Sequence, residues 1–130
     1  MPLFMICFPP QVIQSDGGNL AACINAATLA LINAGIPMKD YVSACISSYV
    51  EEKALVDINM LEENSGAPSL TLAMLPKSDN IILFEMDSRL HIDGLERILA
   101  NAKKGCNDIS AILQRTIRDN IAEHAVTLVI

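Results

Sequence analysis

Apolar residues recur along this chain with the spacing of helices at its two ends and the spacing of strands between them. From residue 19 to residue 34 they return every three or four positions, and Gly35-Ile36-Pro37 then ends the pattern. From 93 to 124 the same interval persists much longer, with Asp93 placed to cap it. We therefore predict two helices, 19–34 and 93–124. Gly105 inside the second marks a bend or a close contact.

Between these helices the chain turns to β-branched and small residues in short runs, which are typical of strands. Residues 42–59 are divided by the charged turn Glu51-Glu52-Lys53, which predicts an antiparallel hairpin. Residues 69–75 and 81–87 form a second pair, joined by a segment of turn-forming residues. Gln11 to Ser15 has the pattern of the end of a further strand. The predicted fold class is α+β, an antiparallel sheet covered by helices, with both long helices on one face.

One aliphatic core is expected, because 52% of the 130 residues are hydrophobic and only 4% are aromatic. The predicted core positions are Ile24, Leu31, Ile46, Leu55, Leu72, Leu83, Leu99 and Ile109. Residues 1–10 are apolar but end in two prolines, which cannot donate hydrogen bonds to a sheet. We therefore separate residues 1–10, an atypical segment that adds little packing, from a partial domain over residues 11–130.

The charge balance and the cysteines limit the classes of function. Nine basic against fifteen acidic residues give a net charge of -6, so this chain alone is not expected to grip a polyanion. The four cysteines form no C-x-x-C pair, which favours reduced, buried thiols of an intracellular protein. Residues 1–10 include no basic residue, and no apolar stretch approaches the roughly 20 residues that cross a bilayer. We expect neither a signal peptide nor a membrane partner.

Two motifs carry candidate chemistry. Asp16-Gly17-Gly18-Asn19 precedes a predicted helix, whose backbone N–H groups could hold a phosphate; alternatively, the glycines only turn the chain. Asp57 follows an apolar strand and Glu63 comes six residues later. Two such carboxylates could bind a divalent cation together, or both could simply be solvated. The local pattern favours the structural reading in both cases.

Four segments of the chain occur in a characteristic order. They are Gln14–Ala22, Ala34–Asp40, Val56–Glu63 and Glu85–Leu90. Taken together they resemble the RNase PH family, and within it the ring subunits of the RNA exosome. The resemblance extends from Gln11 to about His124. It implies the C-terminal half of an RNase PH-like fold, which is a ribosomal protein S5 domain 2-like fold built of two similar halves.

The resemblance also implies roles for the two motifs. In that family the loop matching residues 16–19 binds phosphate, and an aspartate matching Asp57 acts with a second aspartate in phosphorolysis of RNA from its 3′ end. Here the second position is Glu63, whose head group is displaced by a methylene. The arginines of active relatives lie in the half that the resemblance does not cover. We therefore expect Asp57, Glu63 and the loop to be vestigial, with no catalytic residue, metal or cofactor.

The expected function is that of a truncated, non-catalytic structural subunit of the RNA exosome. It would support 3′-to-5′ RNA processing and degradation, including rRNA maturation, in the nucleus, nucleolus and cytoplasm. The implied partners are other RNase PH-like subunits of the hexameric ring, RNA-binding cap subunits and an associated hydrolytic ribonuclease, with RNA threaded through the ring. Two alternatives stay open: a phosphate-dependent 3′-to-5′ exoribonuclease that borrows arginines from another subunit, and a non-functional splice product that folds poorly.

Overall fold

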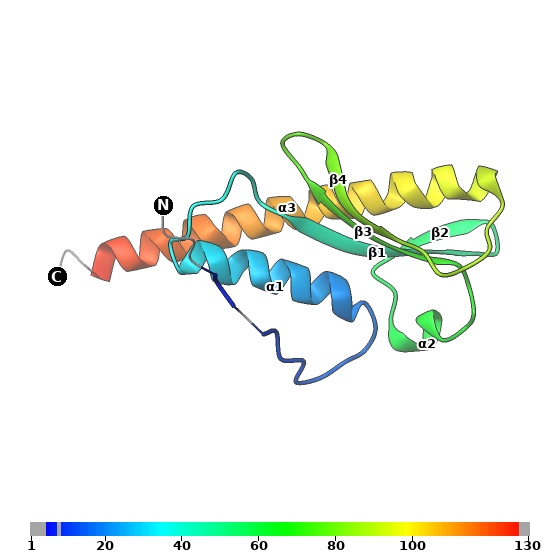
Figure 1. Cartoon of the computed structure of the whole chain (residues 1–130), viewed down its shortest axis with the longest axis horizontal. Helices are drawn as coiled ribbons and strands as arrows, with labels where there is room; N and C mark the ends of the chain where they lie inside the picture. The colour runs from blue at the N-terminus through cyan, green and yellow to red at the C-terminus, as the bar shows by residue number, and fades with distance from the viewer. Residues whose placement is uncertain (1–4, 8, 128–130) are drawn as a thin grey trace.

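The computed structural model describes residues 5–7 and 9–127, and the side chains of its last helix as far as residue 123. The elements shown in Figure 1 are, in chain order, α1 (Asn19–Asn33), β1 (Ser43–Val50), β2 (Lys53–Val56), α2 (Met60–Glu63), β3 (Ser69–Leu75), β4 (Asn80–Glu85) and α3 (Ile92–Thr127). Both long helices and the two predicted strand pairs are confirmed, with small shifts at their ends. The single turn α2 was not predicted. No helix in the described part of the chain combines the length and hydropathy needed to span a membrane.

The four strands form one antiparallel sheet in the order β2-β1-β3-β4. The turn between β1 and β2 places Glu51 and Glu52 in the left-handed region, with φ values of 47° and 64°. Between β3 and β4 the register shifts after Ala73, whose partner is Leu83, so that Ile82 becomes the extra residue of a bulge. The predicted α+β class and the antiparallel sheet are therefore confirmed.

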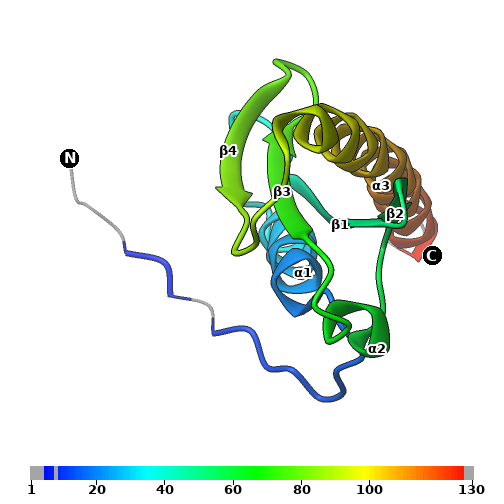
Figure 2. The same ribbon diagram turned by 90° about the vertical axis from the view of Figure 1, so that its right-hand side faces the viewer.

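The two long helices lie on opposite faces of this sheet, so the expectation that they share a face is wrong (Figure 2). Cys45 and its cross-strand partner Leu72 pack against α3, whereas Ala44 and its partner Ala73 pack with Ala21 of α1. Neighbouring residues of a strand point to opposite faces. The first six residues of β1 are all buried, which shows that both faces of this strand are covered.

Most of the buried side chains lie between α3 and the sheet. This larger cluster consists of Cys45, Leu70, Leu72, Met74, Ile98, Ala102 and Cys106. The smaller cluster, between α1 and the sheet, consists of Ala21, Ala44 and Ala73. Among the predicted core positions, Ile46 and Leu72 are buried, and those only partly buried are Ile24, Leu31, Leu55, Leu83, Leu99 and Ile109. Leu31 and Leu55 belong to neither cluster, so their prediction as core residues is wrong.

Gly105 allows α3 to lie directly against the sheet. A Cβ atom at this position would stand 2.6 Å from Sγ of Cys45 and 2.9 Å from Cγ1 of Val56. The helix continues through this point from Ile92 to Thr127. Of the two readings of this glycine, the close contact is therefore the correct one.

Residues 11–15 do not form the strand that their pattern predicts. The segment is coil, and the side chains of Val12 and Ile13 are 53% and 99% exposed. A strand needs a neighbour for its backbone N–H and C=O groups, and no described strand lies beside this segment. Residues 5–7 and 9–10 are exposed as well, as expected of a segment that adds little packing; residues 1–4 and 8 lie outside the described residues.

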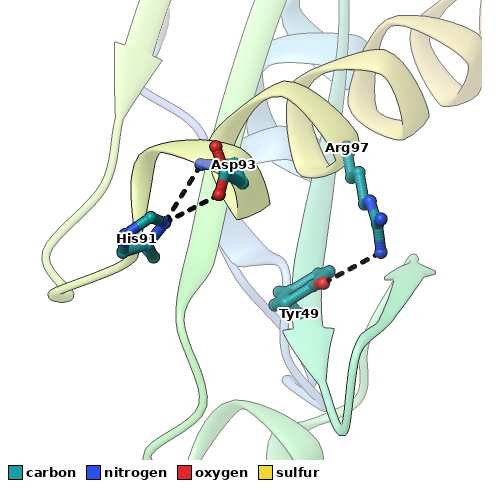
Figure 3. A network of polar contacts seen from close by, with 4 residues as sticks. All are labelled: Tyr49, His91, Asp93 and Arg97. Atoms are coloured by element: carbon teal, nitrogen blue, oxygen red, sulfur yellow. Dashed lines mark hydrogen bonds and ion pairs between the residues drawn. The ribbon is translucent and has the colours of Figure 1, made fainter.

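The start of α3 differs from the prediction that Asp93 caps the helix (Figure 3). The helix begins at Ile92, so Asp93 lies within its first turn. His91 takes the capping position: its carbonyl oxygen accepts from the N–H of Gly94 at 2.9 Å, and its Nδ1 lies 3.5 Å from the backbone nitrogen of Asp93. The Asp93 carboxylate lies 3.2 Å from the same Nδ1. Its negative charge in the first turn interacts favourably with the positive end of the helix dipole.

Candidate functional site

The predicted phosphate loop lies at the start of α1 and touches the single turn α2. Gly17 and Gly18 have φ values of 94° and 62°, which glycine adopts without strain. A Cβ atom on Gly17 would stand 2.6 Å from the backbone carbon of Asn59 and 2.8 Å from the oxygen of Ile58. Gly17 therefore serves a close approach between two backbone segments, as well as a turn.

The carboxylate of Glu63 stands at the N-terminal end of α1. Its Oε2 accepts a hydrogen bond from the N–H of Gly18 at 3.3 Å. In the opposite direction, Oδ1 of Asp16 accepts from the N–H of Met60 at 3.5 Å. Asn19 opens the helix, and its Oδ1 accepts from the hydroxyl of Ser15 at 2.9 Å. Exposed N–H groups at a helix start attract anions. Here the carboxylate of Glu63, which belongs to the chain itself, takes the position that a phosphate would occupy.

The single turn α2 positions Glu63 through its own cap. The side chain of Asn59 accepts from the N–H of Glu62 at 2.9 Å, and Oε2 of Glu62 accepts from the N–H of Asn59 at 2.9 Å. This reciprocal pair is a capping box. The sequence carried its signal, an asparagine followed three residues later by a glutamate, but the turn was too short to show an apolar period.

Asp57 and Glu63 line different cavities. Asp57 follows β2, and its N–H donates to the carbonyl of Ile46 at 2.9 Å. It lines a cavity of about 360 Å³ between α1 and α3. Glu63 lines a cavity of about 290 Å³ beside the start of α1. Among the described residues, no group of three or more His, Cys, Asp or Glu side chains is arranged to hold a metal ion.

Both cavities are lined by acidic side chains besides Asp57 and Glu63. The Glu63 cavity is also lined by Glu85 and Asp87, and the Asp57 cavity by Asp108. Neither lining includes a Lys or Arg among the described residues. A phosphate group entering either cavity would meet like charges with no cation to offset them.

Asn25 completes the open edge of β1 beside the larger cavity. Only the second half of β1, from Ser47 to Val50, pairs with β2. On the other half, the Asn25 side chain donates to the carbonyl of Ala44 at 2.9 Å and accepts from its N–H at 2.8 Å. The amide thus replaces a neighbouring strand. Sequence reasoning missed this role, although a single amide in the middle of an apolar helix is the signal.

Two buried thiols lie on the α3 side of the sheet. Burial raises the pKa of Cys45 to about 11, with a smaller contribution from the negative charge of Asp57. Burial likewise raises the pKa of Cys106 to about 12. Since the thiolate is the reactive form, neither group is a candidate nucleophile. All four cysteines are free, but the expectation that all are buried is wrong for Cys7, which is exposed, and for Cys23, which is only partly buried.

Known proteins match this chain in two blocks. Residues 9–37 match domain 1 of the 3′ exoribonuclease family, and residues 40–105 match domain 2 of the same family. The exosome complex component RRP41 of Homo sapiens is 49% identical over 118 residues, which are 91% of this chain and 48% of that protein. The RRP41 homolog of Arabidopsis thaliana is 40% identical over 92% of this chain and 50% of that protein. The chain therefore spans about half the length of the curated relatives it matches.

The fold agrees with these matches. A crystal structure of rice (Oryza sativa) Rrp46 superposes with a TM-score of 0.77 at 24% identity, covering 83% of this chain and 52% of that one. The boundary between the two blocks falls between α1 and β1, so the domain 1 match ends with α1 and the domain 2 match takes in the whole sheet and the first part of α3. Since the domain 2 match alone covers half of the residues, this chain belongs to the 3′ exoribonuclease family typified by RNase PH.

Proposed function

We propose that this chain is a non-catalytic structural subunit of an RNA exosome ring. In that role it supports 3′-to-5′ RNA processing and degradation, including rRNA maturation. The relatives from Homo sapiens and Arabidopsis thaliana are both exosome complex components, and they align with nearly the whole chain. Because the chain spans about half of each, the role of those whole proteins is a proposal for this one.

The contact between Glu63 and Gly18 carries the non-catalytic part of the proposal. A phosphate at the start of α1 would have to displace this carboxylate from the N–H of Gly18, 3.3 Å away. It would then lie in a cavity lined by Glu85 and Asp87, with no basic side chain in the described lining. Asp57 lines the other cavity. The residues that the family resemblance assigns to phosphate and catalysis therefore stand in surroundings that oppose an anionic substrate.

The proposed partners and locations follow from the ring role. We propose that the chain contacts other RNase PH-like ring subunits, and that RNA-binding cap subunits and a hydrolytic ribonuclease complete the assembly in the nucleus, nucleolus and cytoplasm. RNA passing through such a ring would be held chiefly by the partners. The net charge of -6 supports this division, because phosphate contacts depend on Lys and Arg.

Phosphorolysis by the purified chain tests the absence of catalysis. The chain would be incubated with single-stranded RNA and inorganic phosphate, and released nucleoside diphosphates measured by chromatography. We expect none above background, and none for Glu63→Asp, which restores the family's shorter carboxylate but supplies no cation. Phosphate-dependent release that is abolished by Asp57→Ala would establish the exoribonuclease alternative instead.

Affinity purification of the tagged chain from its own cells tests the ring role separately. We expect exosome ring subunits in stoichiometric amounts by quantitative mass spectrometry. Recovery of the chain without them would contradict a ring role and favour the non-functional product. Recovery of ring subunits with the chain does not depend on whether the chain carries out phosphorolysis. The ring role and the absence of catalysis can therefore each be contradicted without the other.

A further inference from the structure

The strand β4 forms an exposed and apolar edge of the sheet. Its residues Asn80–Glu85 read Asn-Ile-Ile-Leu-Phe-Glu, and none of them is buried. Ile81, Ile82 and Phe84 are 41%, 53% and 46% exposed. The strand pairs with β3 on one side, and no described strand lies on its other side (Figure 2). The outer edge of β4 therefore presents backbone N–H and C=O groups with no neighbouring strand.

The opposite edge of the sheet, β2, has features that protect an edge from pairing. It is only four residues long and begins with Lys53. The side chain of Asn101 on α3 also donates to the carbonyl oxygen of Ala54 at 3.0 Å, so one carbonyl of the strand is occupied. Short length and lysine both discourage pairing at an edge. β4 is longer and contains neither lysine nor proline, so it is the edge that favours an added strand.

A bulge in β4 restricts which strand can be added. Ile82 is the extra residue of this bulge. Met74 and Leu72, the β3 partners of Ile81 and Phe84, both belong to the larger buried cluster toward α3. Ile81 and Phe84 therefore face the same side of the sheet, although residues three apart in a regular strand would face opposite sides. A regular strand placed along this edge would be offset by one residue at the bulge.

We propose that β4 is a docking surface for β4 of a second copy of this chain. The two strands run antiparallel about a two-fold axis, with Ile81 of each copy opposite Phe84 of the other and Asn80 opposite Glu85. The two bulges then lie opposite each other, so both strands have the same number of residues between paired positions. Because Ile81 and Phe84 share a face, these side chains of both copies form one apolar cluster on the α3 side. The charge of Glu85 faces an amide and not a second acid.

Other occupants fit this edge less well. A regular strand of another protein would be offset at the bulge, whereas a second copy carries the same bulge. A nucleic acid would require basic residues, and β4 has none. Each copy has a net charge of -6, so the two copies repel each other and dimerisation should strengthen as salt screens this repulsion. The proposal rests on the geometry of β4 and does not depend on the proposed ring role.

Sedimentation velocity of the purified chain at increasing concentration tests the proposal. We expect an equilibrium of monomer and dimer, with residues 80–85 gaining protection from hydrogen exchange as the dimer forms. Ile81→Lys and Phe84→Glu should each weaken dimerisation by more than about tenfold, because each places an unpaired charge in the apolar cluster. Ile121→Lys, at a position of α3 that is 63% exposed, should leave dimerisation unchanged.

A mixture of the two β4 variants tests the register. When Ile81→Lys and Phe84→Glu are mixed in equal amounts, the introduced lysine of one chain lies opposite the introduced glutamate of the other. The second pair of the interface keeps its native side chains. We therefore expect the mixture to form a heterodimer more tightly than either variant dimerises alone. Association through unspecific apolar contacts would gain nothing from mixing.

Three results would overturn the proposal. They are a chain that stays monomeric up to about 100 μM, an equal loss of dimerisation in Ile121→Lys, and a mixture that associates no better than its components. Circular dichroism melts of all variants come first, to establish that each is folded. If a β4 variant does not fold, hydrogen exchange of the unaltered chain decides. Protection of residues 80–85 that rises with concentration supports docking, and unchanged exchange contradicts it. None of these readouts involves RNA turnover or ring subunits.

Discussion

Gly17→Ala should destabilise the fold by about 2 to 5 kcal/mol through two separable effects. The residue has a φ of 94°, where a Cβ atom costs about 1 to 2 kcal/mol. The new atom would also stand 2.6 Å from the backbone carbon of Asn59 and 2.8 Å from the nitrogen of Met60. Backbone atoms cannot rotate aside as a side-chain end can. Relief therefore requires a shift of α2 itself, an overpacking cost of about 1 to 3 kcal/mol.

Gly66 offers a matched control for the backbone term. It has a φ of 78°, and an added Cβ would meet nothing within 4 Å. Gly66→Ala should therefore lose only about 1 to 2 kcal/mol. The difference between the two alanine variants measures the contact between the loop and α2. Gly17→Asn gives a third value, because asparagine tolerates the left-handed region better but retains the clash.

Urea denaturation followed by circular dichroism measures all three variants. The free energies of unfolding are compared with one shared m value, the slope of free energy against urea concentration. A change in midpoint then reports a change in stability. Equal losses for Gly17→Ala and Gly66→Ala would refute the reasoning, because they would show that the loop is not held against α2. The packing of α2 would then no longer explain how the Glu63 carboxylate is held against the N–H of Gly18 at the start of α1.

The remaining predictions use the same purified chain. Ile98→Ala, in the cluster under α3, should cost about 2 to 5 kcal/mol, and Leu31→Ala, outside both clusters, clearly less; equal urea midpoints would contradict the assignment of the core. Asn25→Leu should cost about 1 to 3 kcal/mol, because it leaves a backbone donor and acceptor of β1 without partners; an unchanged free energy of unfolding would argue against the edge role. Iodoacetamide at about pH 8 should label the exposed Cys7 and spare Cys45, whose pKa is raised by burial to about 11, as peptide mass spectrometry would show. Because an unfolded thiol titrates near 9.0, the contribution of Cys45 to stability should fall as the pH rises from about 9 toward 11, and a Cys45→Ala variant should lack this loss.

The elements of the fold could be predicted because each depends on neighbours in the sequence. The length of α3 follows from the apolar stripe that continues along it, and the turn between β1 and β2 follows from the charged residues Glu51 and Glu52. The side of the sheet that each helix covers could not be predicted. β1 has small residues on both faces, and their burial does not alternate. Only the pairing of Ala44 with Ala73 and of Cys45 with Leu72 shows which residues face which helix.

The candidate site was predicted as two motifs but not as an arrangement. The sequence indicates that Gly17 and Gly18 make a turn before a helix, and that Asp57 and Glu63 are close in the chain. The bond from Gly18 to Glu63 joins residues 45 positions apart, so it depends on tertiary packing that no local pattern encodes. Asn25 was missed for the same reason, because its partner is the backbone of β1. The prediction of a strand at residues 11–15 was wrong because an apolar pattern does not show whether a second strand lies alongside to pair with it.

The order of the elements, with α3 after all four strands, affects how the protein folds. Cys45 and Leu72 are synthesised well before Ile98 and Cys106, the α3 residues that cover them. The sheet is complete only with β4, which ends at Glu85, and its aliphatic face stays uncovered until α3 packs on it, because α1 covers the opposite side. A folding intermediate that has the sheet but lacks a docked α3 therefore exposes Leu70, Leu72 and Met74 to solvent.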